Sequence, residues 1–127
     1  MKNSWYSIQA KGAEAKISIH DEIGLYGVDA KTFMEDQTAL EGVEAINLSI
    51  HSPGGDVIEG WAMYNKLVDH PAHITAKVEG FAGSMASVIL MAADHIVMPQ
   101  NSFLMIHNPW AMVGGDAQDM IDMADSL

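Results

Sequence analysis

The stretch GFAGSMAS, residues 80–87, places one serine, Ser84, among small side chains. Residues 73–80 alternate in a way that predicts a strand, and the apolar residues that follow Ser84 predict a buried helix to about Ala93. Two interpretations of this serine remain open from the stretch alone. Either Ser84 caps the helix, or its hydroxyl is a nucleophile beside main-chain N–H groups that have no partner within the helix.

Strand and helix patterns alternate along the rest of the chain. Strands are expected at residues 15–24, 45–52, 73–80, 95–99 and 102–109, and helices at 28–42, 57–70, 85–93 and 114–127. In the first helix, Phe33, Gln37 and Leu40 share one face. Asp116 is expected to cap the last helix. This alternation predicts a single α/β domain over residues 1–127, built on a largely parallel sheet.

Composition and charge exclude several classes of function. The net charge of −11 over 127 residues repels nucleic-acid phosphates and anionic membrane surfaces, so neither is an expected partner. The chain has no cysteine, which excludes disulfides, thiolate zinc sites and cysteine nucleophiles. The scattered histidines lack the spacing of a zinc hydrolase, so we expect no metal site. No signal-peptide pattern or bilayer-length apolar run is found, and we expect a cytoplasmic protein.

Two further segments could act together with Ser84. The N–H groups of Gly54 and Gly55, in the Ser-Pro-Gly-Gly turn after a strand, could stabilise a negative charge or simply form a tight turn. His107 closes a hydrophobic strand before an Asn-Pro turn signal, where it is either a structural histidine or a base. Because the carboxyl ends of parallel strands meet at one edge of a sheet, we expect the three segments to converge.

The segments SPGG (52–55), GFAGSMAS (80–87) and MIHNP (105–109), in this order, resemble the Clp protease proteolytic subunit (ClpP) family. Residues 20–24 (HDEIG) and 98–110 (MPQNSFLMIHNPW) are similar to its phage and prophage branch, which is associated with head maturation. The resemblance implies a ClpP or crotonase-like spiral of ββα units. It also implies that the last helix begins the handle that joins rings, and that the domain is truncated within this handle.

The resemblance further implies a serine-type endopeptidase that hydrolyses peptide bonds through an acyl-enzyme and needs no metal or organic cofactor. Ser84 would be the nucleophile and His107 the general base, and the N–H groups of Gly55 and Met85 would form the oxyanion hole. An extended peptide would bind by strand addition beside three residues: Gly54, Asp56 and Val57. The aspartate that completes the family's triad would lie beyond Leu127, so we expect weak or absent activity from these residues alone.

The expected partners are a peptide or protein substrate and further copies of the chain in a hexameric or heptameric ring, single or stacked. The sequence does not indicate the native substrate or whether an unfoldase ATPase delivers it. An inactive ring-forming assembly or scaffold subunit is the main alternative. A crotonase-type acyl-CoA enzyme is disfavoured because such enzymes use carboxylates, and because an acidic chain offers little to nucleotide phosphates. The family usually has asparagine where this chain has His51.

Overall fold

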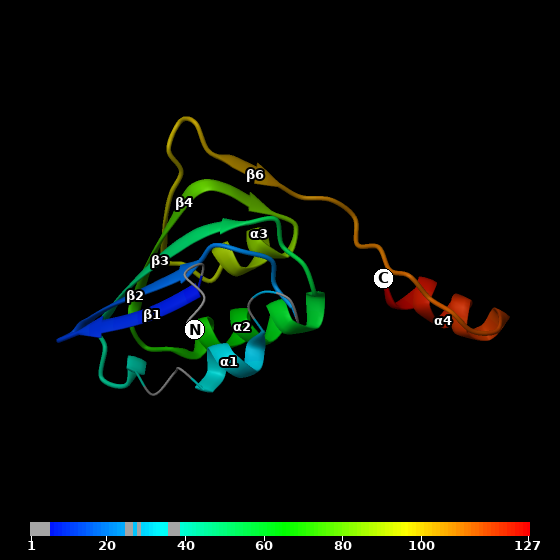
Figure 1. Cartoon of the computed structure of the whole chain (residues 1–127), viewed down its shortest axis with the longest axis horizontal. Coiled ribbons are helices and arrows are strands. Elements are labelled where there is room, and N and C mark those ends of the chain that lie inside the picture. Colours follow the sequence, from blue (N-terminus) through cyan, green and yellow to red (C-terminus); the bar gives the residue numbers. More distant parts are fainter. Residues whose placement is uncertain (1–5, 25–26, 28, 36–38) are drawn as a thin grey trace.

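The computed structural model describes residues 6–24, 27, 29–35 and 39–127. The elements, in chain order, are β1 (Tyr6–Lys11), β2 (Glu14–Ile19), α1 (Ala30–Glu35), β3 (Ala45–Ser52), α2 (Val57–Asp69), β4 (His73–Gly83), α3 (Met85–Leu90), β5 (His95–Val97), β6 (Phe103–Met105) and α4 (Ala117–Ser126). Strands β1 to β5 lie in sequence order in one sheet, and β6 pairs with the carboxyl end of β4 (Figure 1). Every pairing is parallel except that of β1 with β2. The expected α/β fold with a largely parallel sheet is therefore confirmed.

One face of the sheet and the helices form a single hydrophobic core. Side chains at alternate positions of the central strands are fully or almost fully buried: Ile17, Ile19, Leu48, Ile50, Ala76 and Val78. Phe33 from α1, Leu67 from α2 and Ile89 from α3 belong to the same cluster. Alternation with a period of two explains why one set of strand side chains enters this core while the intervening set is largely polar. The packed core holds the ends of the strands in fixed positions.

The sheet contains one strand that the sequence patterns did not predict. Strand β1 forms an antiparallel hairpin with β2, in which Lys11 pairs with Glu14. Gly12 adopts a φ of 62° in the two-residue connection, a conformation that short hairpin turns favour and that glycine adopts readily. A glycine between two runs of alternating residues is the sequence signal that could have predicted this hairpin.

Several predicted boundaries also differ from the structure. The helix expected at 28–42 is seen as α1, which ends at Glu35, whereas residues 36–38, including Gln37, lie outside the described residues. Helix α3 ends at Leu90 instead of continuing to Ala93, and the chain then forms tight turns. The expected strands at 15–24 and 102–109 end at Ile19 and Met105. Boundaries fail more often than elements because helix and strand ends depend on contacts with other elements.

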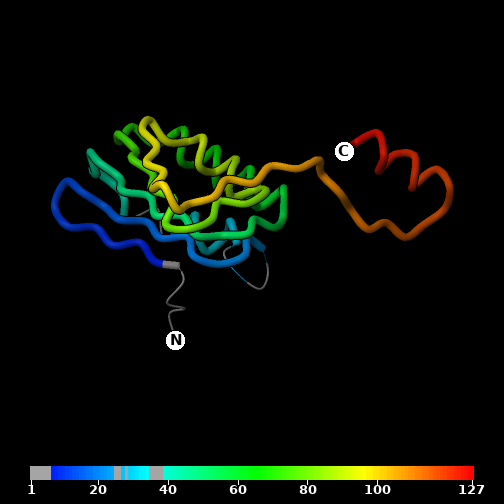
Figure 2. Tube along the Cα trace, turned by 90° about the horizontal axis from the view of Figure 1, so that it is seen from above, coloured from blue at the N-terminus to red at the C-terminus, as the bar shows by residue number. Residues whose placement is uncertain are grey.

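Helix α4 lies away from the sheet. After β6 the chain runs outward to this helix, drawn in orange and red in Figures 1 and 2, and none of its residues is buried. The Asp116 carboxylate accepts hydrogen bonds from the N–H groups of Gln118 and Asp119 in a capping box, as the predicted cap requires. Among the helices of the described residues, α4 included, none has both the length and the apolar character needed to cross a bilayer.

We expect Leu48→Ala to lower the free energy of unfolding by about 2–5 kcal/mol, because it leaves a cavity in the fully buried face of β3. The matched control is Asn47→Ala, at the neighbouring exposed position on the other face, which should change stability by no more than about 0.5 kcal/mol. Urea unfolding measures both variants. Equal losses would contradict the assignment of the two faces.

Candidate active site

The pairing of β4 with β6 brings Ser84 and His107 together. Gly83 at the end of β4 pairs with Met105 at the end of β6, and the Ser84 N–H donates to the Met105 carbonyl at 2.8 Å. His107 lies two residues beyond the end of β6 rather than within the strand. Its Nε2 lies 2.7 Å from the Ser84 Oγ, which is hydrogen-bonding distance. Two of the three predicted segments therefore meet at the carboxyl edge of the sheet.

The backbone of Ser84 is strained. Its φ of 50° is the only positive value found at a non-glycine residue among those described, and such conformations cost of the order of 1–3 kcal/mol. Ser84 is the N-cap residue of α3, but its side chain makes no capping hydrogen bond. The hydroxyl is directed to His107 instead. The Ser84 carbonyl accepts from the Ser87 Oγ at 2.5 Å and from the Ser87 N–H at 3.0 Å, which holds the turn.

The Ser-Pro-Gly-Gly turn lies directly against this strained turn. A β-carbon built on Gly54 would lie 2.6 Å from the Gly83 carbonyl oxygen and 2.7 Å from the Met85 nitrogen. Real β-carbon contacts are longer than this, and Gly54 also has a φ of 91°, so only glycine fits. The Ser52 Oγ accepts from the Gly54 N–H at 3.1 Å. The third predicted segment therefore joins the first two.

The two main-chain N–H groups predicted to form the oxyanion hole belong to Gly55 and Met85. Gly55 bridges Ile23, and the two hydrogen bonds of this bridge use the Gly54 carbonyl and the Asp56 N–H, each at 2.9 Å. In such a parallel bridge the N–H of the central residue, here Gly55, points away from the partner strand. The Met85 N–H opens α3 and has no acceptor within the helix. In the described part of the chain, neither N–H is assigned a hydrogen-bond acceptor.

The three residues predicted to bind a peptide, Gly54, Asp56 and Val57, differ in their contacts and exposure. Ile23 occupies the edge formed by the Gly54 carbonyl and the Asp56 N–H. The Asp56 side chain is the N-cap of α2 and accepts from the Glu59 N–H at 2.9 Å. Val57 is half exposed at the start of α2. Because Ile23 already pairs with one edge of this turn, an added peptide strand would pair with the opposite edge, which carries the Gly55 N–H.

His51 supports the strand that leads to Ser84. Ile50 pairs with Val78 but Ser52 pairs with Ala82, so β4 contains a bulge opposite His51. The Phe81 N–H donates to the His51 Nδ1 at 3.2 Å. The imidazole thus replaces a main-chain acceptor where the bulge interrupts the ladder. The family that the sequence resembles usually has asparagine at this position. An asparagine side chain also carries a hydrogen-bond acceptor.

A second serine–histidine pair lies on the polar face of the sheet. His20 Nε2 is 2.7 Å from the Ser49 Oγ, and the Ser49 hydroxyl donates to Glu79 at 3.1 Å. Burial lowers the pKa of His20, and the nearby His51 lowers it further. Because the Ser49 hydroxyl already donates to a carboxylate, its proton is not available to His20. Ser49 also lies within regular strand β3, away from unpaired helix N–H groups, so this pair lacks the features found at Ser84.

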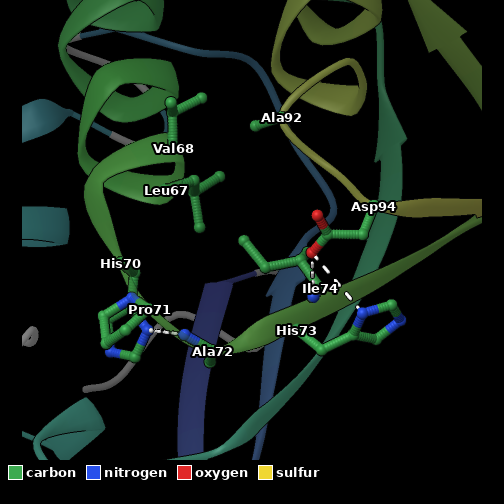
Figure 3. Close-up of a pocket in the computed structure, with 9 residues that line it drawn as sticks. All are labelled: Leu67, Val68, His70, Pro71, Ala72, His73, Ile74, Ala92 and Asp94. Atoms are coloured by element: carbon green, nitrogen blue, oxygen red, sulfur yellow. Dashed lines mark hydrogen bonds and ion pairs between the residues drawn. The ribbon is translucent and has the colours of Figure 1, made fainter.

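One cavity formed by the described residues lies at the other end of β4. It has a volume of about 360 Å³ and is lined by residues including Leu67, His70, Ile74 and Asp94 (Figure 3). The Asp94 carboxylate accepts from the Ile74 N–H at 2.7 Å there. The cavity sits where β4 begins, whereas Ser84 follows the residue at which β4 ends. It is therefore separate from the serine–histidine pair.

Among the described residues, no acidic side chain joins Ser84 and His107 to complete a catalytic triad. No hydrogen bond or ion pair joins a carboxylate of that part to His107. Asp116, Asp119 and Asp122 instead make hydrogen bonds within α4 and its cap. The described residues contain no group of three or more histidine or carboxylate side chains that could hold a metal ion.

Comparison with known proteins identifies the family. A family model described as Clp protease matches residues 2–127. The chain belongs to the Clp protease family. The resemblance in the sequence motifs is thereby confirmed at the level of the family, and the phage branch stays a prediction.

Bacterial relatives within this family are similar over part of their length. One, named ATP-dependent Clp protease proteolytic subunit 3, from Rhodococcus jostii (strain RHA1), is 38% identical over 84 residues, or 65% of this chain and 42% of the relative. A subunit 1 from Streptomyces avermitilis is 35% identical over 85 residues, covering 65% of this chain and 39% of the relative. A subunit 1 from Corynebacterium jeikeium (strain K411) is 36% identical over 85 residues, covering 65% and 45%. The chain spans about two fifths of the length of these curated relatives.

We expect Gly54→Ala to abolish reaction with a fluorophosphonate, a probe of activated serines, and to destabilise the fold. The added methyl group would collide with the Gly83 and Met85 main chain. Gly12→Ala is the matched control, since Gly12 also has a positive φ but has no atom within 4 Å of an added β-carbon. The control should lose only about 1–2 kcal/mol of stability and keep its reactivity. Equal reactivity of the two variants would contradict the close approach.

We expect His20→Gln to make stability less dependent on pH over the range near and below about 6.5, where an unfolded histidine takes up its proton. The lowered pKa means that native His20 resists the proton that the unfolded chain takes up below a pKa of about 6.5. The unfolded state then binds more protons, so wild-type stability falls as the pH falls through this range. Glutamine does not titrate and removes this contribution. Urea unfolding at several pH values gives the two curves, and parallel curves would contradict the assignment.

Proposed function

We propose that this chain supplies the nucleophile, the base and the oxyanion hole of a serine endopeptidase subunit. The proposal rests above all on the hydrogen bond of 2.7 Å between the Ser84 Oγ and the His107 Nε2. Membership of the Clp protease family supports it, as do the names of the relatives, which describe proteolytic subunits of ATP-dependent proteases. The crotonase-type alternative has no comparable support from the site, which pairs a serine with a histidine.

In the proposed mechanism the Ser84 Oγ attacks the carbonyl carbon of a peptide bond while its proton passes to the His107 Nε2. The negative charge on the carbonyl oxygen is stabilised by hydrogen bonds from the Gly55 and Met85 N–H groups. As the tetrahedral intermediate collapses, His107 gives its proton to the leaving amine, and an ester to Ser84 remains. Water, deprotonated by His107, then hydrolyses this ester. Neither a metal nor an organic cofactor takes part in these steps.

The tautomer of His107 sets how fast this chain could act. Nε2 accepts the serine proton only when the ring proton is on Nδ1, and a carboxylate bound to Nδ1 normally enforces this state. Its loss from a triad lowers turnover by a factor of the order of 10⁴. Since no described carboxylate contacts His107, we expect slow turnover from these 127 residues. Covalent labelling of Ser84 is therefore a better readout than peptide turnover.

We further propose that residues 1–127 are part of one peptidase domain that assembles with copies of itself into a ring. Large apolar side chains are exposed in β6, directly after it and in α4, including Phe103 at 70%, Ile106 at 79% and Ile121 at 53%. Exposed apolar groups of this kind indicate an interface. The same proposal includes the processing of phage head proteins as the function of this chain. Its only support is the resemblance of residues 20–24 and 98–110 to the phage and prophage branch of the family.

We expect fluorophosphonate to label the chain at one serine. Ser84→Ala should abolish labelling because the probe needs the strained, histidine-bound hydroxyl. Ser49→Ala is the matched control, since Ser49 also lies 2.7 Å from a histidine but lacks neighbouring oxyanion donors, and it should keep full labelling. Intact-protein mass spectrometry counts the adducts.

Labelling that survives Ser84→Ala would contradict the peptidase proposal. A wild-type chain that forms oligomers in light-scattering measurements but never reacts with the probe would instead favour the assembly or scaffold subunit.

A further inference from the structure

Gly60 lies inside helix α2, where a glycine has an energetic cost. Glycine in a helix interior is about 1 kcal/mol less favourable than alanine. Gly60 is buried, and it is absent from the glycines with positive φ among the described residues. Its backbone conformation is therefore one that any residue adopts. The reason for a glycine at this position lies instead in the residues that surround it.

The side chain of Met85 lies against the backbone of Gly60. A β-carbon built on Gly60 would lie 2.2 Å from the Met85 Cγ, 2.8 Å from its Cε and 3.2 Å from its Sδ. The Cγ is only two bonds from the Met85 main chain, so a collision there is relieved by a change of χ1 or by movement of the backbone itself. Met85 is 5% exposed, and the neighbouring Ala86 and Ile89 are at most 1% exposed. Little space remains for a rotamer change in such packing.

Met85 is held from its other side as well. Its nitrogen lies 2.7 Å from the position of a β-carbon built on Gly54. Met85 thus packs between two glycines, with its main-chain N–H beside Gly54 and its side chain on Gly60. A shift caused at either contact moves the N–H that directly follows Ser84.

We propose that Gly60 is a positioning residue of the oxyanion hole. Because it lacks a side chain, α2 accepts the Met85 side chain directly on its backbone, and this contact sets the direction of the Met85 N–H relative to Ser84 and Gly55. The inference rests on the proposed peptidase function for its catalytic consequence. The packing itself does not depend on that function.

The test is Gly60→Ala in the full chain, with the rate of fluorophosphonate labelling measured against probe concentration. Removal of one oxyanion donor lowers rates by about 10²–10³, and we expect misplacement of the donor to slow the maximal labelling rate by about 10- to 100-fold. The probe concentration at half-maximal rate should change little, because binding does not require the donor. Gly114→Ala is the matched control, since an added β-carbon there has no atom within 4 Å, and it should label at the wild-type rate.

Rescue separates positioning from general damage. The double variant Gly60→Ala with Met85→Ala removes the colliding side chain but keeps the main-chain N–H, so it should label faster than Gly60→Ala alone. A Gly60→Ala protein that labels within twofold of the wild-type rate would overturn the inference. A double variant no faster than Gly60→Ala would also overturn it.

A measurement that does not depend on the reactivity of Ser84 distinguishes this inference from the proposed function. In ¹H–¹⁵N NMR spectra of the full chain, Gly60→Ala should shift the Ser84 and Met85 amide resonances, and the double variant should return that of Ser84 towards its wild-type position. These shifts are expected even if wild-type Ser84 never reacts with the probe, in which case only the peptidase proposal fails. Unchanged amide resonances in Gly60→Ala would overturn the positioning role itself.

Discussion

The site depends on one main-chain hydrogen bond, from the Ser84 N–H to the Met105 carbonyl at 2.8 Å. It extends the pairing of β4 with β6 by one residue beyond Gly83 and fixes the register of the two chain segments. With that register, a serine that directly follows β4 and a histidine two residues beyond β6 come into contact. A change of register by one residue would turn the histidine to the other side.

Glycines allow the three segments to approach one another at the backbone level. Gly54 contacts the Ser84 turn, Gly55 lies against Ile23, and Gly60 accepts Met85. Each contact allows a close approach that a β-carbon would prevent, and at Gly54 this approach is to the main chain on either side of Ser84. In the proposed mechanism, main-chain N–H groups placed by these contacts, rather than a charged side chain, stabilise the oxyanion.

The two serine–histidine pairs have the same distance between oxygen and nitrogen but different main-chain surroundings. Ser49 and Ser84 each lie 2.7 Å from a histidine nitrogen. Ser49 sits in a regular strand and donates its proton to Glu79, whereas Ser84 has a strained backbone and lies beside the start of a helix. The surrounding main chain therefore distinguishes the two pairs, and for this reason the proposed function assigns the nucleophile to Ser84.

Much of the fold could be predicted because its signals are local. Alternation along β3, the apolar stripe of α2 and the Asp116 cap each involve residues within a few positions, so sequence alone carries them. Strand β1 was missed because the hairpin signal rested on the single Gly12. The end of α3 was misjudged because the apolar run continues past Leu90 while the chain turns.

The order of the turn at 52–55, Ser84 and His107 was readable in the sequence, since each follows a predicted strand and parallel strands bring their carboxyl ends together. The Ile23 bridge to Gly55, the use of His51 at the bulge and the packing of Met85 on Gly60 were not readable. These contacts join residues about 25–35 positions apart, and they follow from the register of the sheet and the packing of α2 on α3. Local sequence therefore determined the elements and the residue types of the site, whereas only the tertiary structure decided which backbone atoms meet, because close approach depends on long-range pairing and packing.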